Sequence, residues 1–279
     1  MGQALALALP LKLAYKIAVV LGDVKRVLSP RDTRNICANF RQIFGPDDPN
    51  IHVYVKEIYR NFSKYLVDFF RFSKINKEFI EHNVRLINLD NLGLARKKGK
   101  GAIAVTAHLG NWELAGVVVS LEGYPLVAVT LEHKNKKVND FFQSQRKNMD
   151  IEVVTLGSSM KRCFTGLKEN KVLALVGDRD FTHRGVTTNF FGKTMQIPKG
   201  PAWLSLTVGA PIVPGFLLRD KDDKFRFIME KPIEYTPTGD MEADIFNLTN
   251  LYLKVLERYI KDYPEQWFVF RKFWEPAIW

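Results

Sequence analysis

This sequence has few cysteines, and its glycine and proline contents are ordinary. Its 279 residues include two cysteines, Cys37 and Cys163, which are too few for a disulfide framework and favour a reducing compartment. Neither lies at metal-ligand spacing from another cysteine or a histidine, which argues against a zinc module. With 18 glycines and 13 prolines, the composition excludes collagen-like and largely disordered proteins.

An uninterrupted apolar run is also missing at the start of the chain. Residues 4–22 are mostly apolar, but Pro10, Lys12 and Lys16 lie inside the stretch. A spanning helix needs about 20 residues with few or no charges, and a secretory signal keeps lysines outside its apolar part. We therefore expect an amphipathic helix lying in the plane of a membrane surface. The alternative is a buried N-terminal helix with a solvated basic face.

Acidic residues are outnumbered, and the imbalance is uneven. The net charge is +11, with 18 Lys and Arg against 9 Asp and Glu in residues 1–100, and 23 against 21 thereafter. A basic front end indicates an anionic partner, either nucleic acid or an anionic membrane. Basic residues directly after the apolar stretch favour the cytoplasmic face of a membrane. With no zinc finger, RNP motif or basic reading helix, we expect no nucleic-acid binding.

The patterning predicts an N-terminal membrane anchor, residues 1–28, followed by a single domain, residues 29–279. Within that domain, residues 29–100 are expected to be helical. From residue 101, apolar strands alternate with helices, which predicts an α/β fold with a mostly parallel central sheet flanked by helices. The predicted strands are 102–107, 126–130, 152–156, 172–176, 211–217 and 225–229, and the predicted helices are 112–121, 137–148, 159–169, 201–208 and 242–262.

The first of these strands leads into a candidate catalytic histidine. Active sites of such sheets lie at the carboxyl ends of the strands, and His108 directly follows strand 102–107. Gly110 permits a tight turn, Asn111 is a good N-cap, and Glu113 falls in the first helical turn. A carboxylate that holds one imidazole nitrogen leaves the other free to remove a hydroxyl proton. The pattern alone also fits a structural histidine.

Two later positions carry further chemistry. Arg146, near the end of helix 137–148, suits a phosphate group, or is a helix-surface arginine. Asp178 and Asp180 follow strand 172–176 at alternate positions, so both side chains can point the same way. Taken alone, this pair is typical of a Mg²⁺ or Mn²⁺ site in a glycosyltransferase.

The C-terminal segment concentrates aromatic side chains beside Arg271 and Lys272. It includes Trp267, Phe268 and Trp274. Such a mixture suits a membrane–water interface, and equally a segment packed over the sheet.

Five motifs occur in an order that has a known parallel. They are residues 101–116 around His108, residues 139–146, residues 172–180 ending in Asp-Arg-Asp, residues 190–192 and residues 263–274. Together they resemble the bacterial lipid A biosynthesis (lauroyl/myristoyl) acyltransferase family, a branch of the His-x4-Asp/Glu glycerolipid acyltransferases. Asn189, Phe270 and Lys272 depart from the family's usual proline, histidine and arginine.

The resemblance implies a reaction and roles. His108 would remove the proton from an acceptor hydroxyl that attacks an acyl thioester, with Glu113 orienting His108. The residues expected to contact or organise the substrate are Asn111, Arg146, Asp178, Arg179 and Asp180. No metal and no cofactor is expected. The donor would be acyl carrier protein or acyl-CoA, and the acceptor a lipid A precursor or related glycolipid, at the cytoplasmic face of a bacterial inner membrane.

Two other functions remain open on the sequence alone. One is a lysophospholipid or glycerol-phosphate acyltransferase of the same superfamily. The other is a metal-dependent glycosyltransferase that uses Asp178 and Asp180.

Overall fold

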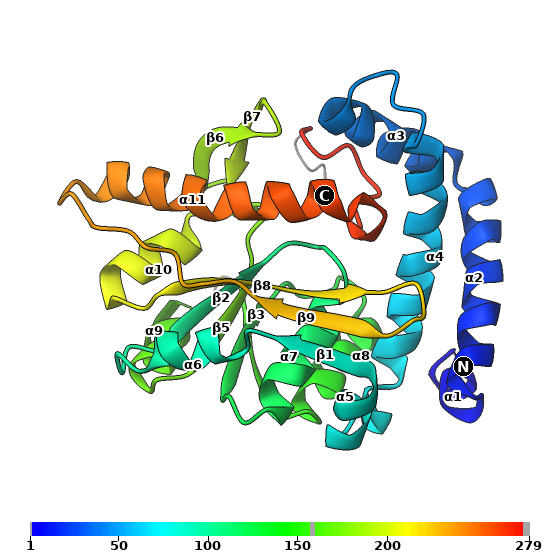
Figure 1. Ribbon diagram of the computed structural model, residues 1–279, viewed down its shortest axis with the longest axis horizontal. Coiled ribbons are helices and arrows are strands. Elements are labelled where there is room, and N and C mark those ends of the chain that lie inside the picture. The colour runs from blue at the N-terminus through cyan, green and yellow to red at the C-terminus, as the bar shows by residue number, and fades with distance from the viewer. Residues whose placement is uncertain (1, 157–159, 276–279) are drawn as a thin grey trace.

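A seven-stranded sheet forms the centre of the computed structural model, which describes residues 2–156 and 160–275 (Figure 1). The strand order is β1-β9-β8-β2-β5-β3-β4, and β8, β2, β5, β3 and β4 run parallel. β9 is antiparallel to β8 and parallel to β1, so the sheet is mostly parallel as predicted. The strands are β1 (Val84–Ile87), β2 (Ala102–Thr106), β3 (Leu126–Thr130), β4 (Ile151–Thr155), β5 (Val172–Val176), β8 (Ile212–Arg219) and β9 (Phe225–Met229).

Helices cover both faces of the sheet and give each face its own apolar core. On one face lie α9 (Met160–Lys168), α10 (Gly200–Val208) and α11 (Met241–Asp262). On the other lie α5 (Lys77–Asn83), α6 (Asp90–Arg96), α7 (Trp112–Leu121) and α8 (Lys136–Lys147). The apolar strands therefore bury side chains on both sides, as parallel strands do.

The six predicted strands and five predicted helices are all present, with limits within about two residues of those predicted. The start of helix 159–169 is not compared, because residue 159 lies outside the described residues. Three strands were not predicted. β1 lies within the segment expected to be entirely helical; it is a four-residue edge strand that joins the sheet through β9. β6 (Val186–Phe190) and β7 (Lys193–Ile197) form a separate antiparallel hairpin, and most of their residues are polar, unlike those of the predicted apolar strands.

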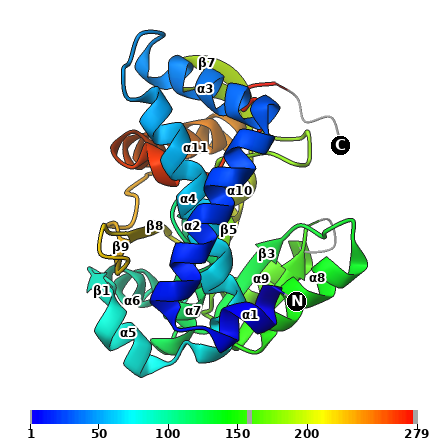
Figure 2. The ribbon, with the colours of Figure 1, turned by 90° about the vertical axis from the view of Figure 1, so that its right-hand side faces the viewer.

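The N-terminal region is entirely helical and lies along one side of the molecule (Figure 2). It consists of α1 (Gly2–Ala8), α2 (Leu11–Leu28), α3 (Pro30–Phe44) and α4 (Ile51–Phe70). A short 3₁₀ turn follows α4 at Phe72–Lys74, and another lies near the C-terminus at Pro264–Gln266. Pro10 separates α1 from α2, because proline cannot continue the hydrogen bonding of the preceding helix. None of the helices in the described ranges is both long and apolar enough to cross a membrane.

α2 packs tightly against α4. Its buried positions include Ala14, Ala18 and Gly22, four residues apart on one face. A Cβ atom on Gly22 would lie 2.8 Å from the Tyr59 carbonyl oxygen, so the two backbones approach closely at this point. The opposite face of α2 carries exposed apolar side chains. α2 is therefore amphipathic, with one apolar face already occupied by the protein.

Candidate active site

The candidate catalytic histidine lies in the turn between β2 and α7. Gly110 adopts φ +64°, and a Cβ there would lie 2.1 Å from the Leu217 carbonyl oxygen, so only glycine fits this approach. The Gly110 amide donates to the Gln266 carbonyl (2.9 Å), and the Phe268 amide donates to the His108 carbonyl (2.9 Å). The C-terminal segment thus packs over the sheet and fixes the turn that carries His108.

His108 contacts a buried carboxylate from the neighbouring strand. Its Nδ1 lies 2.7 Å from Asp178 Oδ1, and its backbone amide donates to Asp178 Oδ2 at 3.2 Å. Trp267 Nε1 also donates to Oδ2, at 3.2 Å. His108 and Asp178 each follow, by two residues, the paired positions Thr106 and Val176. The sheet register itself brings the two side chains together.

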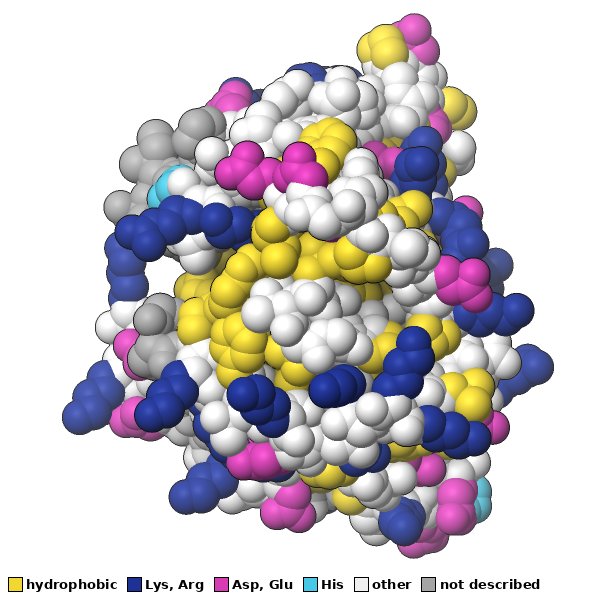
Figure 3. Space-filling view, turned by 90° about the vertical axis from the view of Figure 1, so that its left-hand side faces the viewer, with side chains coloured by type: hydrophobic (Ala, Val, Ile, Leu, Met, Phe, Trp, Pro, Cys, Tyr) yellow, Lys and Arg dark blue, Asp and Glu magenta, His cyan; other side chains and the backbone are white. Residues whose placement is uncertain are grey.

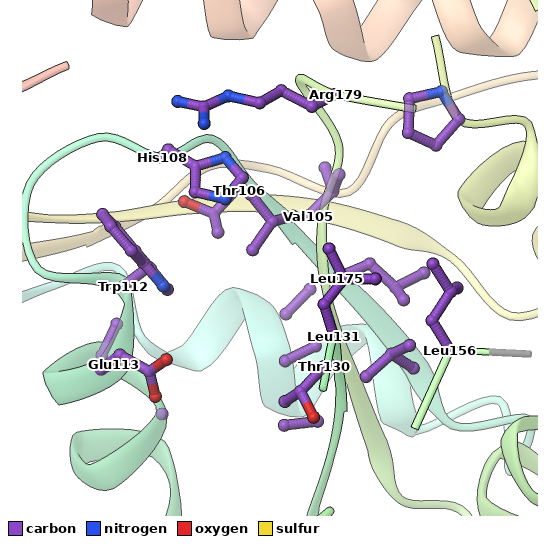
Figure 4. Close-up of a pocket in the computed structure, with 18 of the residues that line it drawn as sticks. Val105, Thr106, His108, Trp112, Glu113, Thr130, Leu131, Leu156, Leu175 and Arg179 are labelled. Atoms are coloured by element: carbon purple, nitrogen blue, oxygen red, sulfur yellow. The ribbon is translucent and has the colours of Figure 1, made fainter. Parts of the chain in front are cut away.

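This pairing replaces the one expected from the sequence. Glu113 contacts Arg146 and not His108: Arg146 Nε and Nη2 donate to the two Glu113 oxygens at 2.9 and 2.6 Å. The bidentate ion pair is largely buried. Trp112 lies between His108 and Glu113 in the view of Figure 4, with its ring 5.1 Å from the imidazole. Glu113 lies in the first turn of α7 as predicted, but its carboxylate contacts Arg146 on α8.

The remaining predicted substrate contacts divide into two groups. Asn111 is 3% exposed, and both ends of its amide are used: Oδ1 accepts from the Leu114 amide, and Nδ2 donates to Asp68. Asp178 is completely buried, so it reaches the cavity only through His108. These contacts give Asn111 and Asp178 roles in holding the turn and the imidazole rather than in touching a ligand.

Three of the residues predicted to contact or organise the substrate do line the cavity: Arg146, Arg179 and Asp180. Arg146 is 6% exposed and engaged with Glu113, which leaves little of it for a phosphate. Asp180 accepts from the amides of Thr182 and Gly185, so it shapes its own loop. Arg179 donates to the Phe268 carbonyl at 2.8 Å and extends beside His108 (Figure 4).

The electrostatics keep the imidazole neutral and the aspartate ionised. Burial, together with the charge of Arg179, lowers the pKa of His108 below its ordinary value of 6.5. Burial raises the pKa of Asp178, but His108, Arg179 and the Trp267 N–H outweigh it, and the net shift is downward. A neutral His108 that donates Nδ1–H to Asp178 leaves Nε2 free to accept a proton.

An apolar cavity of about 1080 Å³ extends from His108 into the protein. Ala104, Ala174 and Ala128 form a row in register across β2, β5 and β3, and all three line it. Ala115 and Gly116 on α7 line the opposite wall. Small side chains on both walls keep open a channel between the sheet and α7 that larger side chains would fill.

Comparison with known proteins separates an acyltransferase from a glycosyltransferase. Residues 1–275 match the family model described as bacterial lipid A biosynthesis acyltransferase. The chain belongs to this family. It is similar to the phosphatidylinositol mannoside acyltransferase of Mycolicibacterium smegmatis strain ATCC 700084 / mc(2)155, with 27% identity over 77% of this chain and 70% of that protein. It is also similar to the phosphatidylinositol mannoside acyltransferase of Mycobacterium tuberculosis strain H37Rv, with 31% identity over 55% of this chain and 51% of that protein.

As a member of the bacterial lipid A biosynthesis acyltransferase family, the chain is an acyltransferase, and the glycosyltransferase interpretation of Asp178 and Asp180 is wrong. The local chemistry agrees. Both Asp178 oxygens are committed to His108 and Trp267, and the Asp180 oxygens to backbone amides and Thr182. Across residues 2–156 and 160–275, no group of three or more His, Cys, Asp or Glu side chains could hold a metal ion.

The sequence did not predict that Asp178 is the partner of His108, or that Trp267 donates to Asp178. The signal for Asp178 was present, because His108 and Asp178 both follow predicted strands. Pairing them required knowing that β2 and β5 are neighbours, which the order of strands along the chain does not reveal. Trp267 comes from a segment about 90 residues further on, whose position over the sheet depends on tertiary packing.

Proposed function

We propose that this acyltransferase moves a fatty acyl chain from a thioester to a hydroxyl of a glycolipid at a membrane surface, with His108 as general base. The observation that carries the proposal is geometric: the His108 imidazole is paired with buried Asp178 and lines a large apolar cavity. Such an imidazole supplies the base, and the cavity provides a dry site for an acyl chain.

In the proposed reaction, His108 Nε2 removes the proton from the acceptor hydroxyl as its oxygen attacks the thioester carbonyl carbon. The C–S bond then breaks, and the thiol leaves with the proton that the imidazolium returns. Asp178 holds the tautomer and stabilises the imidazolium. Neither step requires a metal or a cofactor.

The negative charge that develops on the carbonyl oxygen needs a donor. The amides of Gly110 and Asn111, at the turn, are unsuitable because they already donate to Gln266 and Leu217. Arg179 is the better candidate, since it lines the cavity beside His108. We assign Arg179 to binding the reacting carbonyl or an anionic group of the substrate.

Association with the membrane is supported by the outer face of α2. Its exposed apolar side chains are between 44% and 74% accessible, and exposed lysines lie on the same helix. α2 is the outermost helix on the side that faces the viewer in Figure 2. An in-plane helix of this kind suits an anionic bilayer, and we propose the cytoplasmic face of the bacterial inner membrane. The exposed apolar residues of α2 are Leu13, Val20, Leu21, Val24, Val27 and Leu28.

A basic surface also suits an acidic donor protein. Lys97, Lys98 and Lys100 in the loop after α6 are exposed, and a row of Lys and Arg side chains lies below an apolar area on the face in Figure 3. This favours acyl carrier protein as donor, with acyl-CoA as the alternative. The family description and the names of the relatives favour a lipid A precursor or a phosphatidylinositol mannoside as acceptor.

The test is a transfer assay in detergent with acyl carrier protein and CoA thioesters, each offered to both acceptors. Mass spectrometry should detect an acceptor heavier by one acyl group, and a chelator should leave the rate unchanged. Absence of product from every donor, with a protein that is folded by circular dichroism, would contradict the proposal.

A further inference from the structure

A second buried carboxylate lies close to the catalytic turn and takes no part in the proposed chemistry. Asp68 on α4 is 4% exposed and accepts hydrogen bonds from the Tyr15 hydroxyl, from Asn111 Nδ2 at 2.8 Å and from the Arg219 guanidinium. These donors come from α2, the catalytic turn and the end of β8. Asp68 therefore joins three elements that are distant in the sequence.

Asn111 connects this carboxylate to the catalytic histidine, which lies three residues before it. Its Oδ1 caps α7 by accepting from the Leu114 amide at 3.0 Å, and its backbone amide donates to the Leu217 carbonyl at 2.8 Å. With Nδ2 on Asp68, each polar group of the side chain has one fixed partner. A shift of Asp68 must therefore move the turn or break one of these contacts.

Arg219 provides a second route from the carboxylate to the same turn. Two hydrogen bonds fix its backbone to the Gln266 side chain. The Arg219 amide donates to Gln266 Oε1 at 2.9 Å, and Gln266 Nε2 donates to the Arg219 carbonyl at 2.9 Å. The Gln266 carbonyl in turn accepts from the Gly110 amide. Asp68, Arg219, Gln266, Gly110 and Asn111 form a closed ring of contacts around the turn.

Tyr15 attaches α2 to these contacts through its hydrogen bond to Asp68. Its ring centroid lies 4.8 Å from the Arg219 guanidinium carbon, and its side chain is 4% exposed, so it covers the Asp68–Arg219 ion pair. Burial and the neighbouring Asp68 raise the pKa of the Tyr15 hydroxyl, which remains a donor at neutral pH. The same helix turns its opposite, apolar face to the exterior.

We propose that Tyr15 and Asp68 are positioning residues, through which α2 fixes the turn from His108 to Asn111. The helix predicted to be a membrane anchor is then also part of the catalytic framework. This inference rests on the proposed role of His108 as the base. A misplacement of about 1 Å at a reacting group can cost up to about a hundredfold in rate, so losing one anchor of the turn is expected to reduce kcat measurably.

The test is Tyr15→Phe in the full-length chain, assayed in detergent, where membrane docking is not required. We expect kcat to fall about tenfold while KM for donor and acceptor stays unchanged. Tyr235→Phe is the matched control, because Tyr235 also donates to a buried aspartate, Asp244, at 2.6 Å, remote from the turn. Its kcat should equal that of the wild type.

A double-mutant cycle separates positioning from a general loss of stability. Asn111→Ser keeps a cap for α7, but its shorter side chain cannot reach Asp68. Its effect on kcat should be strongly non-additive with that of Tyr15→Phe, because both substitutions interrupt the same route from α2 through Asp68 to the turn. Three results would overturn this inference but leave the proposed function standing. They are a wild-type kcat in folded Tyr15→Phe, a loss of kcat in Tyr235→Phe as large as in Tyr15→Phe, and additive effects of Tyr15→Phe and Asn111→Ser. An inactive wild type would overturn the proposed function and this inference together.

Discussion

Replacing His108 with alanine should lower kcat for acyl transfer by about 10²- to 10⁴-fold, the range that a positioned general base contributes. The loss should be confined to chemistry, because the backbone contacts of the turn to Phe268 and Asp178 do not involve the imidazole. Donor KM should change little, since the apolar walls of the cavity are untouched. Steady-state kinetics in detergent, with thermal unfolding as the control for folding, measures both.

The loss of kcat identifies His108 as a base only if the variant is folded, with a thermal unfolding midpoint near that of the wild type. Removing the imidazole also removes a hydrogen bond from buried Asp178, so a modest fall in the unfolding midpoint is expected. Full activity in a folded His108→Ala protein would refute the assignment of His108 as the base.

Replacing Asp178 with asparagine should have an effect of similar size, about 10³- to 10⁴-fold on kcat. Three N–H donors face this carboxylate: His108 Nδ1, the His108 amide and Trp267 Nε1. An asparagine replaces one carboxylate oxygen with an NH₂ group, which cannot accept a hydrogen bond. When this NH₂ group faces His108 Nδ1, it favours the tautomer whose proton is on Nε2, the nitrogen that must act as the base.

Glu113→Gln is the informative comparison for Asp178→Asn. It removes the carboxylate that the sequence pairs with His108, yet leaves the His108–Asp178 contact intact. Because it leaves buried Arg146 without its counter-ion, we expect it to lower the free energy of unfolding by about 3–5 kcal/mol. At a temperature where both variants are folded, Glu113→Gln should retain more kcat than Asp178→Asn. The reverse order would make Glu113 the partner that matters to catalysis.

The contrast between these two carboxylates illustrates what the sequence could predict. Alternation of apolar strands and helices predicted β3, β5 and β9 to the residue, because those strands are buried and bounded by clear turns. His108 and the N-cap Asn111 followed from local rules for a strand–turn–helix. Local spacing also suggested Glu113 as the partner of His108, and there it failed, because spacing along one helix says nothing about which strand lies beside it.

The contacts that the sequence could not predict all join distant segments. Asp178 reaches His108 through strand order, Trp267 reaches Asp178 through the packing of the C-terminal segment, and Tyr15 reaches Asp68 through the packing of α2 on α4. The N-terminal stretch shows the same limit. Its composition predicts an amphipathic helix, but it gives no sign that Tyr15 on the inner face contacts a carboxylate next to the catalytic turn.

The pH dependence of kcat/KM for acyl transfer tests the central claim most directly, because it reports the pKa of the essential base in the free enzyme. Burial and Arg179 lower the pKa of His108, and His108 must be neutral to accept a proton. Activity should therefore be constant near neutral pH and fall with decreasing pH through one step whose midpoint lies below 6.5. A midpoint above 6.5, or a rate that increases as the pH falls through this range, would contradict a buried, neutral His108 as the base.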